Sequence, residues 1–131
     1  MKIKSLILKY IVVLFFVHFF SIYANAQTFK CTDVVFNVEL SERQQQKYKS
    51  NTLGVTVTLE FFKNDVKVTV NQKNERPTIM TKIGKDKYKY KQRETVEIIE
   101  LNKILGFIFS VKYLKYENEK LIGTATFERD F

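Results

Sequence analysis

The sequence predicts an all-β domain of about eight antiparallel strands that closes into an up-and-down barrel. Apolar and polar residues alternate along successive segments, which is the pattern of strands with one buried face. Short polar turns separate these segments, so neighbouring strands can pair as hairpins. Closing such a meander leaves no exposed strand edge. An open sheet or a β-sandwich is the alternative architecture.

A cleavable export signal is predicted before this domain. Lys2, Lys4 and Lys9 form a positive stub, an apolar run covers residues 10–23, and Ala-Asn-Ala at 24–26 supplies small residues for cleavage. The apolar run is shorter than the about 20 residues that a transmembrane helix needs. We therefore expect residues 1–26 to be a signal peptide and residues 27–131 a single β domain. The mature chain would have no membrane span and would be periplasmic or secreted.

Signal cleavage also limits the chemistry of the mature chain, because the only histidine, His18, leaves with it. The 22 basic residues fall to 19 against 14 acidic ones, a net charge of +5. Without histidine, activation of a Ser or Cys nucleophile by imidazole and imidazole ligation of zinc are excluded. Only carboxylate chemistry remains, and Glu97 and Glu100 would face opposite sides of their strand. We expect no enzyme activity, no metal and no cofactor.

The first segments of the domain are predicted to be two strands joined by a short helical turn. Ser41 and Gln44 have the spacing of a capping box, which indicates helix over 41–48. Apolar residues alternate with polar ones on either side of it. On the predicted inward face lie Val34, Phe36, Val38, Leu40, Leu53, Val55, Val57, Leu59 and Phe61.

Cys31 is the only cysteine, so the domain cannot contain an internal disulfide. Strict alternation places it on the polar face with Asp33, where an exposed thiol could pair between chains. Free cysteine is, however, among the most buried residue types. Burial near the strand end is therefore expected.

Three hairpins are predicted by their turn residues and by apolar pairing across the strands. The turns are expected at 64–65, 84–87 and 117–119, and the last two long strands at 96–101 and 104–116. The expected pairs are Phe61 with Val68, Leu59 with Val70, Ile83 with Tyr88, Phe109 with Phe127, and Val111 with Ala125.

Eight strands is the size at which a barrel interior either fills with side chains or holds one small ligand. The small residues at 123–126 leave room opposite bulky neighbours, which favours a cavity. This architecture is similar to that of the lipocalin-like or calycin barrels. The mature chain has no tryptophan, so it departs from the Gly-X-Trp feature of lipocalins and from the tryptophan-lined pocket of streptavidin-type binders.

We therefore expect an exported binding protein that carries a small, mainly apolar ligand inside the barrel. Tyrosine suits such a cavity because it has an apolar body and a polar tip. The predicted cavity wall consists of Leu59, Phe61, Val68, Tyr88, Tyr90, Phe107, Phe109, Val111, Tyr113 and Phe127.

The alternative is an interaction or inhibitor-type module with a filled core that binds an anionic or protein partner through a basic ridge. This ridge consists of Lys82, Lys85, Lys87, Lys89, Lys91 and Arg93. Tyr88 and Tyr90 point to the opposite face, so they cannot stack bases beside the lysines, and nucleic acid is not expected as a partner. Lysines on an exposed strand also discourage aggregation between sheets.

Overall fold

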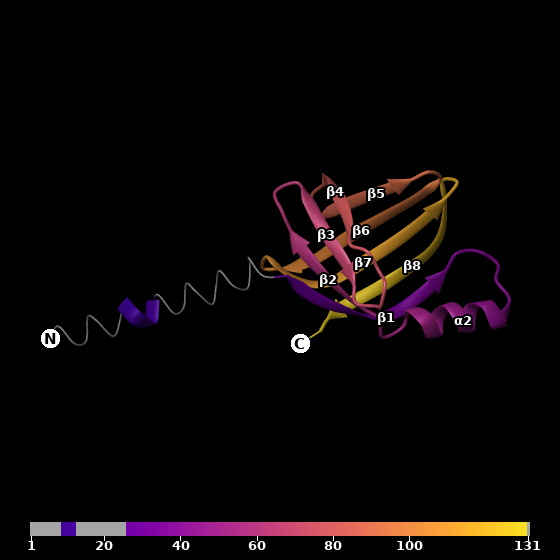
Figure 1. Cartoon of the computed structure of the whole chain (residues 1–131), viewed down its shortest axis with the longest axis horizontal. Helices are drawn as coiled ribbons and strands as arrows, with labels where there is room; N and C mark the ends of the chain where they lie inside the picture. Colours follow the sequence, from indigo (N-terminus) through magenta and orange to yellow (C-terminus); the bar gives the residue numbers. More distant parts are fainter. Residues whose placement is uncertain (1–8, 13–25, 131) are drawn as a thin grey trace.

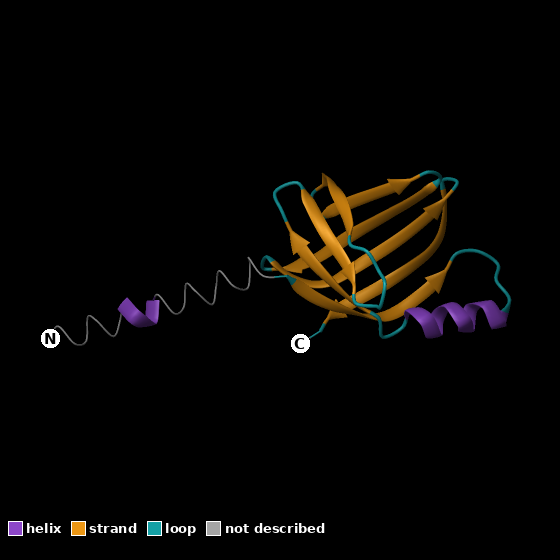
Figure 2. Cartoon of the chain, viewed as in Figure 1, coloured by secondary structure: helices purple, strands orange, loops and turns teal. Residues whose placement is uncertain are grey.

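The computed structural model describes residues 9–12 and 26–130, and residues 26–130 form a closed antiparallel barrel with a helix beside it (Figures 1 and 2). The predicted signal peptide falls largely outside the described residues. Within the described ranges, no helix is long and apolar enough to cross a membrane.

Each strand pairs with the next one along the chain, and β1 pairs with β8 to close the barrel. The predicted all-β fold with eight strands in an up-and-down barrel is therefore confirmed, against the open sheet and the sandwich. The elements are β1 (Gln27–Phe36), α2 (Glu42–Thr52), β2 (Thr56–Phe61), β3 (Asp65–Val70), β4 (Thr78–Gly84), β5 (Lys87–Gln92), β6 (Thr95–Ile104), β7 (Phe107–Glu117) and β8 (Lys120–Arg129).

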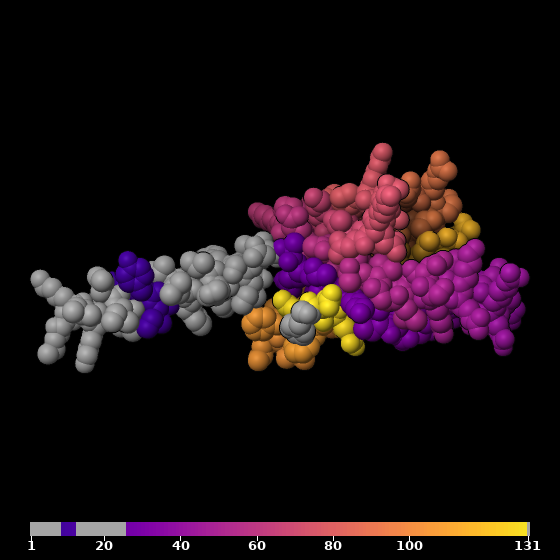
Figure 3. Space-filling model, turned by 60° about the horizontal axis from the view of Figure 1, so that its bottom comes forward, coloured from indigo at the N-terminus to yellow at the C-terminus, as the bar shows by residue number. Residues whose placement is uncertain are grey.

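The two ends of the barrel differ in their connections (Figure 1). We call one the helix end: it carries α2 with its flanking segments, the loop 71–77, and the turns 93–94 and 118–119. We call the other the turn end: it carries the turns 63–64, 85–86 and 105–106, with Gln27 and Arg129 at the limits of the domain. Figure 3 shows the magenta atoms of α2 and the orange atoms around the β6–β7 turn at opposite ends.

Apolar side chains from all eight strands meet inside the barrel. The most deeply buried are Phe29, Leu59, Val66 and Val111, each less than 2 % exposed. At about 25 cal/mol for each Å² of apolar surface removed from water, this interior is the main source of stability. Toward the turn end, the rings of Phe61 and Tyr88 lie 6.1 Å apart on the inside of the barrel.

Helix α2 begins at the predicted capping box and runs four residues further than expected, to Thr52. The amide of Gln44 donates to the hydroxyl of Ser41, and the amide of Ser41 donates to the side-chain oxygen of Gln44, each at 3.2 Å. The helix contains no buried residue. Its stability therefore depends on its cap and on a few contacts with the barrel.

The expected burial of Cys31 is confirmed, and a β-bulge explains it. The register between β1 and β8 shifts between Cys31 and Asp33, so Thr32 is an extra residue and the alternation reverses there. Cys31 faces inward and is 2 % exposed. Burial raises the pKa of its thiol, a backbone hydrogen bond at Asp33 opposes this shift, and the negative charge of Asp33 adds to it.

The turn between β2 and β3 lies one residue earlier than predicted, at 63–64. The amide of Phe62 donates a hydrogen bond to the carbonyl oxygen of Asp65 at 2.9 Å, which closes the turn there. The predicted register is wrong by two residues, a shift that keeps the same side chains facing inward. The observed pairs are Phe61 with Val66, Leu59 with Val68, and Val57 with Val70.

The predicted pairing of Ile83 with Tyr88 is wrong. Gly84 pairs with Lys87 around a two-residue turn, and the register then shifts between Lys82 and Gly84. Ile83 is the extra residue of this bulge and is exposed, while Tyr88 pairs with Lys82.

The last two hairpins also differ from the prediction. β6 continues through Ile104, so the turn is at 105–106 and not before Ile104. The β7–β8 turn has two residues, 118–119, and a bulge between Lys115 and Tyr116 shifts the register. The predicted pairs of this hairpin are wrong, although Val111, Ala125 and Phe127 face inward as predicted. The observed pairs are Val111 with Phe127 and Tyr113 with Ala125.

Candidate ligand pocket at the helix end of the barrel

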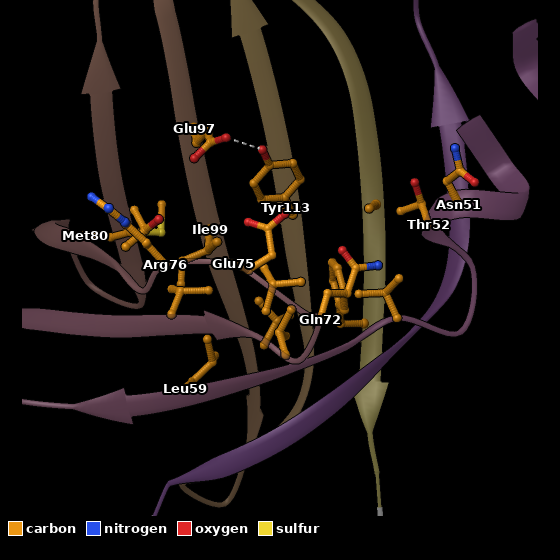
Figure 4. A pocket seen from close by; sticks show the side chains of 18 residues that line it. Asn51, Thr52, Leu59, Gln72, Glu75, Arg76, Met80, Glu97, Ile99 and Tyr113 are labelled. Carbon is orange, nitrogen blue, oxygen red and sulfur yellow. Dashed lines mark hydrogen bonds between the residues drawn. The ribbon is translucent and has the colours of Figure 1, made fainter. Parts of the chain in front are cut away.

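A pocket of about 370 Å³ extends from the helix end into the barrel (Figure 4). Its deep part is apolar, because Leu59, Ile99 and Val111 face inward from β2, β6 and β7. Met80 adds a flexible thioether from β4. A volume above about 300 Å³ with a mainly apolar wall is typical of sites for small molecules.

The mouth of the pocket is polar. Asn51 at the end of α2 and three residues of the loop 71–77, Gln72, Glu75 and Arg76, line it and are exposed. Figure 4 shows the Glu75 and Arg76 side chains beside the labelled pocket residues Met80, Ile99 and Tyr113. An apolar interior below a few polar groups is the arrangement that fixes the orientation of an amphiphilic ligand.

A second pocket, of about 560 Å³, lies beside the first and shares Thr52, Tyr113 and Ala125 with it. Val38 and Leu40, which follow the end of β1, contribute apolar side chains to it. The rings of Phe36 and Tyr48 lie 6.1 Å apart, and this contact connects α2 to β1 at its edge. Helix α2 and the segment before it therefore form the outer wall of this space.

Glu97 and Tyr113 form a polar pair on the pocket wall (Figure 4). The Tyr113 hydroxyl donates a hydrogen bond of 2.6 Å to Glu97 Oε1. Burial raises the pKa of Tyr113, and the hydrogen bond to the Glu97 carboxylate and its negative charge raise it further. The proton therefore stays on Tyr113, and the carboxylate accepts.

Small residues of β8 adjoin both spaces, as the sequence indicates. Ala125 pairs with Tyr113 and lines both pockets, and Gly123 lines the second one. A Cβ atom at Gly123 would lie 3.4 Å from the carbonyl oxygen of Val35, so this glycine also permits close packing of β1 on β8.

The predicted cavity wall divides between the two ends of the barrel. A separate pocket of about 220 Å³ at the turn end is lined by Phe61, Tyr88 and Phe107, and it is smaller than usual ligand sites. Tyr90 faces inward, and its hydroxyl is 3.3 Å from Gln92 Oε1. The larger group lines the pocket at the helix end: Leu59, Val68, Val111, Tyr113 and Phe127.

Phe109 does not belong to the wall, so its placement there is a wrong prediction. The register between β6 and β7 passes from the pair Asn102 and Ser110 to the pair Lys103 and Ile108. Phe109 is the extra residue of this bulge, and 55 % of it is exposed.

The basic ridge lies mostly on the outside of the barrel. Lys87, Lys89 and Lys91 occupy the outer face of β5, and Tyr88 and Tyr90 face inward, as predicted. Lys87 forms a salt bridge of 3.6 Å with Glu100 on β6. Of the other members, Lys85 and Arg93 lie at turns, and Lys82 pairs with Tyr88 at the turn end.

Sequence reasoning missed Glu97, Glu75, Arg76 and Thr52 as pocket residues. Glu97 carried a usable signal, because its position two before Ile99 places a charge on the apolar face of β6. The loop 71–77 and the end of α2 carried none, since their approach to the pocket depends on the closed barrel.

Among the described residues no cluster of His, Cys, Asp and Glu could hold a metal ion. No protein-family model, curated protein or solved structure matches the chain.

Proposed function

We propose that the protein binds a small, mainly apolar ligand in the pocket at the helix end of the barrel, and that it serves as a carrier for this ligand. One observation carries the proposal: a pocket of about 370 Å³ reaches the apolar interior of the barrel through a polar mouth. Leu59, Ile99 and Val111 at its base offer a ligand the burial of apolar surface that drives binding.

The polar groups on the wall select the ligand's head group. The Glu97 carboxylate receives one hydrogen bond from Tyr113 and forms no salt bridge with the residues at 9–12 and 26–130. A carboxylate accepts several hydrogen bonds, so it favours a ligand with an N–H, an O–H or an ammonium group near the apolar body. The preferred ligand is therefore a small amphiphile that carries a hydrogen-bond donor.

Titration with N-phenyl-1-naphthylamine tests this proposal. This uncharged probe has two aromatic rings and one N–H group, and its fluorescence rises in apolar surroundings. Val70 lines the pocket near its mouth, and Val70→Trp should fill the entrance and weaken binding by about tenfold or more.

Thr69→Trp is the matched control, because Thr69 is the neighbouring residue on the outer face of β3. It should bind the probe as the unchanged protein does. Equal affinity of both variants and the unchanged protein would place the probe elsewhere and refute the proposal. Binding lost equally in both variants would refute it as well, provided that both retain the β-sheet circular dichroism of the unchanged protein.

A further inference from the structure

Large apolar side chains are exposed at the turn end of the barrel, far from the pocket mouth. They come from all three turns of this end: Phe62 from the β2–β3 turn, Ile83 from the β4–β5 turn, and Ile104, Leu105 and Phe109 from the β6–β7 hairpin. Each is more than half exposed. Such a group exceeds the isolated apolar residues that surfaces normally carry, and it indicates a surface that something covers.

Leu105 is the clearest member of this group. It occupies the first position of a two-residue hairpin turn with φ +53°, followed by Gly106 with φ +81°, and it is 91 % exposed. Turns of this kind favour Asn or Asp at that position, because a bulky side chain at positive φ is strained. Asn118 follows this rule at the first position of its turn, whereas Arg93 does not. Leu105 therefore carries backbone strain and an apolar side chain exposed to water. Burial of this side chain against an apolar partner would offset both unfavourable contributions.

Basic residues surround the apolar ones. Lys63, Lys82 and Lys85 lie in or beside the turns, and none forms a salt bridge within residues 9–12 and 26–130. Lys103 pairs with Asp86 at 2.8 Å. The other acidic residues near this end are Asp65, Glu128 and Asp130, and Glu100 pairs with Lys87. With Lys87 and Arg129 included, basic residues outnumber acidic ones here by six to five.

The shape of this end favours a lipid surface over a protein groove. Hairpin turns project outward from the barrel, which suits insertion between lipid head groups. Projecting apolar side chains among lysines are the usual elements of binding to anionic membrane surfaces.

We infer that the turn end of the barrel docks on an anionic lipid surface, with Leu105 and Phe109 inserted among the lipids and Lys63, Lys82 and Lys85 beside the head groups. In this orientation the pocket mouth at the helix end faces away from the membrane. The docking is independent of the proposed ligand binding, because the two sites share no residue.

The absence of tryptophan from the chain allows a local test. In Leu105→Trp the only tryptophan lies at the tip, and its emission should shift to the blue with vesicles of phosphatidylcholine and phosphatidylglycerol. Vesicles of phosphatidylcholine alone should give a much smaller shift. In Lys89→Trp, on the outer face of β5, neither vesicle should shift the emission. Phe109→Trp should behave like Leu105→Trp if the first variant folds poorly.

Two further variants separate the apolar and the charged contributions. Leu105→Asn suits the turn and should reduce partition into anionic vesicles about tenfold, since burying one leucine contributes about that factor. Lys82→Ala and Lys85→Ala should each reduce it about fivefold, because each lysine near an anionic surface contributes about 1 kcal/mol. Ile79→Thr, which changes an exposed residue on the outer face of β4, should leave it unchanged.

Unchanged emission of both tip variants with anionic vesicles would overturn the inference. An equal shift in Lys89→Trp would also overturn it, because the contact would then not be confined to the tip. A blue shift that depends on protein concentration without vesicles, together with a dimer mass, would assign this surface to a second copy of the chain instead.

Discussion

The two ends of this barrel expose opposite chemistry. At the helix end, the polar residues Asn51, Glu75 and Arg76 surround an entrance whose interior is apolar. At the turn end, buried side chains such as Phe29 and Val66 leave only a smaller pocket of about 220 Å³, while Leu105 lies on the outside. Apolar surface is thus concave and covered at one end, and convex and exposed at the other. The two proposed sites, one for a small molecule and one for a large surface, therefore lie at opposite ends of the same barrel.

The turns account for this difference. Two of the four connections at the helix end are long: α2 with its flanking segments, and the loop 71–77, both reach the pocket. The connections at the turn end are two-residue turns, which cannot cover the barrel but can present single side chains such as Leu105. Strand order alone would give both ends the same character, so the connections decide what each end can bind.

The first prediction concerns packing, and it tests whether side chains pack more tightly around Phe29 than along the wall of the pocket at the helix end. Phe29 is 0 % exposed, and Phe29→Ala should lower the free energy of unfolding by about 3–5 kcal/mol. Val70, on the pocket wall, is half-buried, and Val70→Ala should lower it by only about 1 kcal/mol. Urea denaturation measures both. Equal losses would mean that the wall of the pocket is packed as tightly as the core.

A smaller change in the free energy of unfolding is expected at the Glu97–Tyr113 pair. Tyr113→Phe removes the hydrogen bond of 2.6 Å to the carboxylate, so it should lower the free energy of unfolding by about 1 kcal/mol in urea denaturation at neutral pH. Tyr116 lies on the outer face of the same strand, and Tyr116→Phe serves as the control. It should lower the free energy of unfolding by less than Tyr113→Phe does.

The pH dependence gives this pair a second signature. Because the pKa of Tyr113 is raised in the folded protein, the stability that its proton brings is complete below the unfolded value of about 10. It is lost as the pH rises above that value. The unchanged protein should therefore lose stability more steeply above pH ~10 than Tyr113→Phe does, in urea denaturation at several alkaline pH values. Parallel losses would contradict the buried environment of Tyr113.

The smallest expected change is an increase in the free energy of unfolding, and it concerns Leu105 at the turn end. Leu105→Asn places a residue that tolerates positive φ in the turn, and it should raise the free energy of unfolding by about 0.5 kcal/mol. Thermal denaturation of both proteins measures it. A loss of stability would show that Leu105 contributes to the fold, and the case for an external contact would weaken. The affinity for N-phenyl-1-naphthylamine should not change, since the pocket lies at the other end.

The fold followed from the sequence because strands with one buried face reveal themselves by alternation. The inward set of Leu59, Val68 and Val111 was predicted correctly for this reason, and the helix cap at Ser41 followed from its capping-box spacing to Gln44. Bulges were not predicted, because one extra residue such as Thr32 or Phe109 leaves no local sequence signal, yet it reverses the alternation.

The pocket was less predictable than the fold. Five of its wall residues followed from alternation along β2, β3, β7 and β8. Its polar part did not, because Glu75 and Arg76 reach the mouth only through the path of the loop 71–77 across the closed barrel. Local patterns describe strands, whereas a loop's position depends on contacts that are distant in sequence.

Native mass spectrometry of the protein purified from the cells that make it shows whether the pocket holds a ligand. We expect a bound small molecule that is released on mild unfolding, and that is absent from Val70→Trp but present in Thr69→Trp. A bare protein mass for all three, with no binding of N-phenyl-1-naphthylamine by the unchanged protein, would contradict the proposal that the pocket is a ligand site.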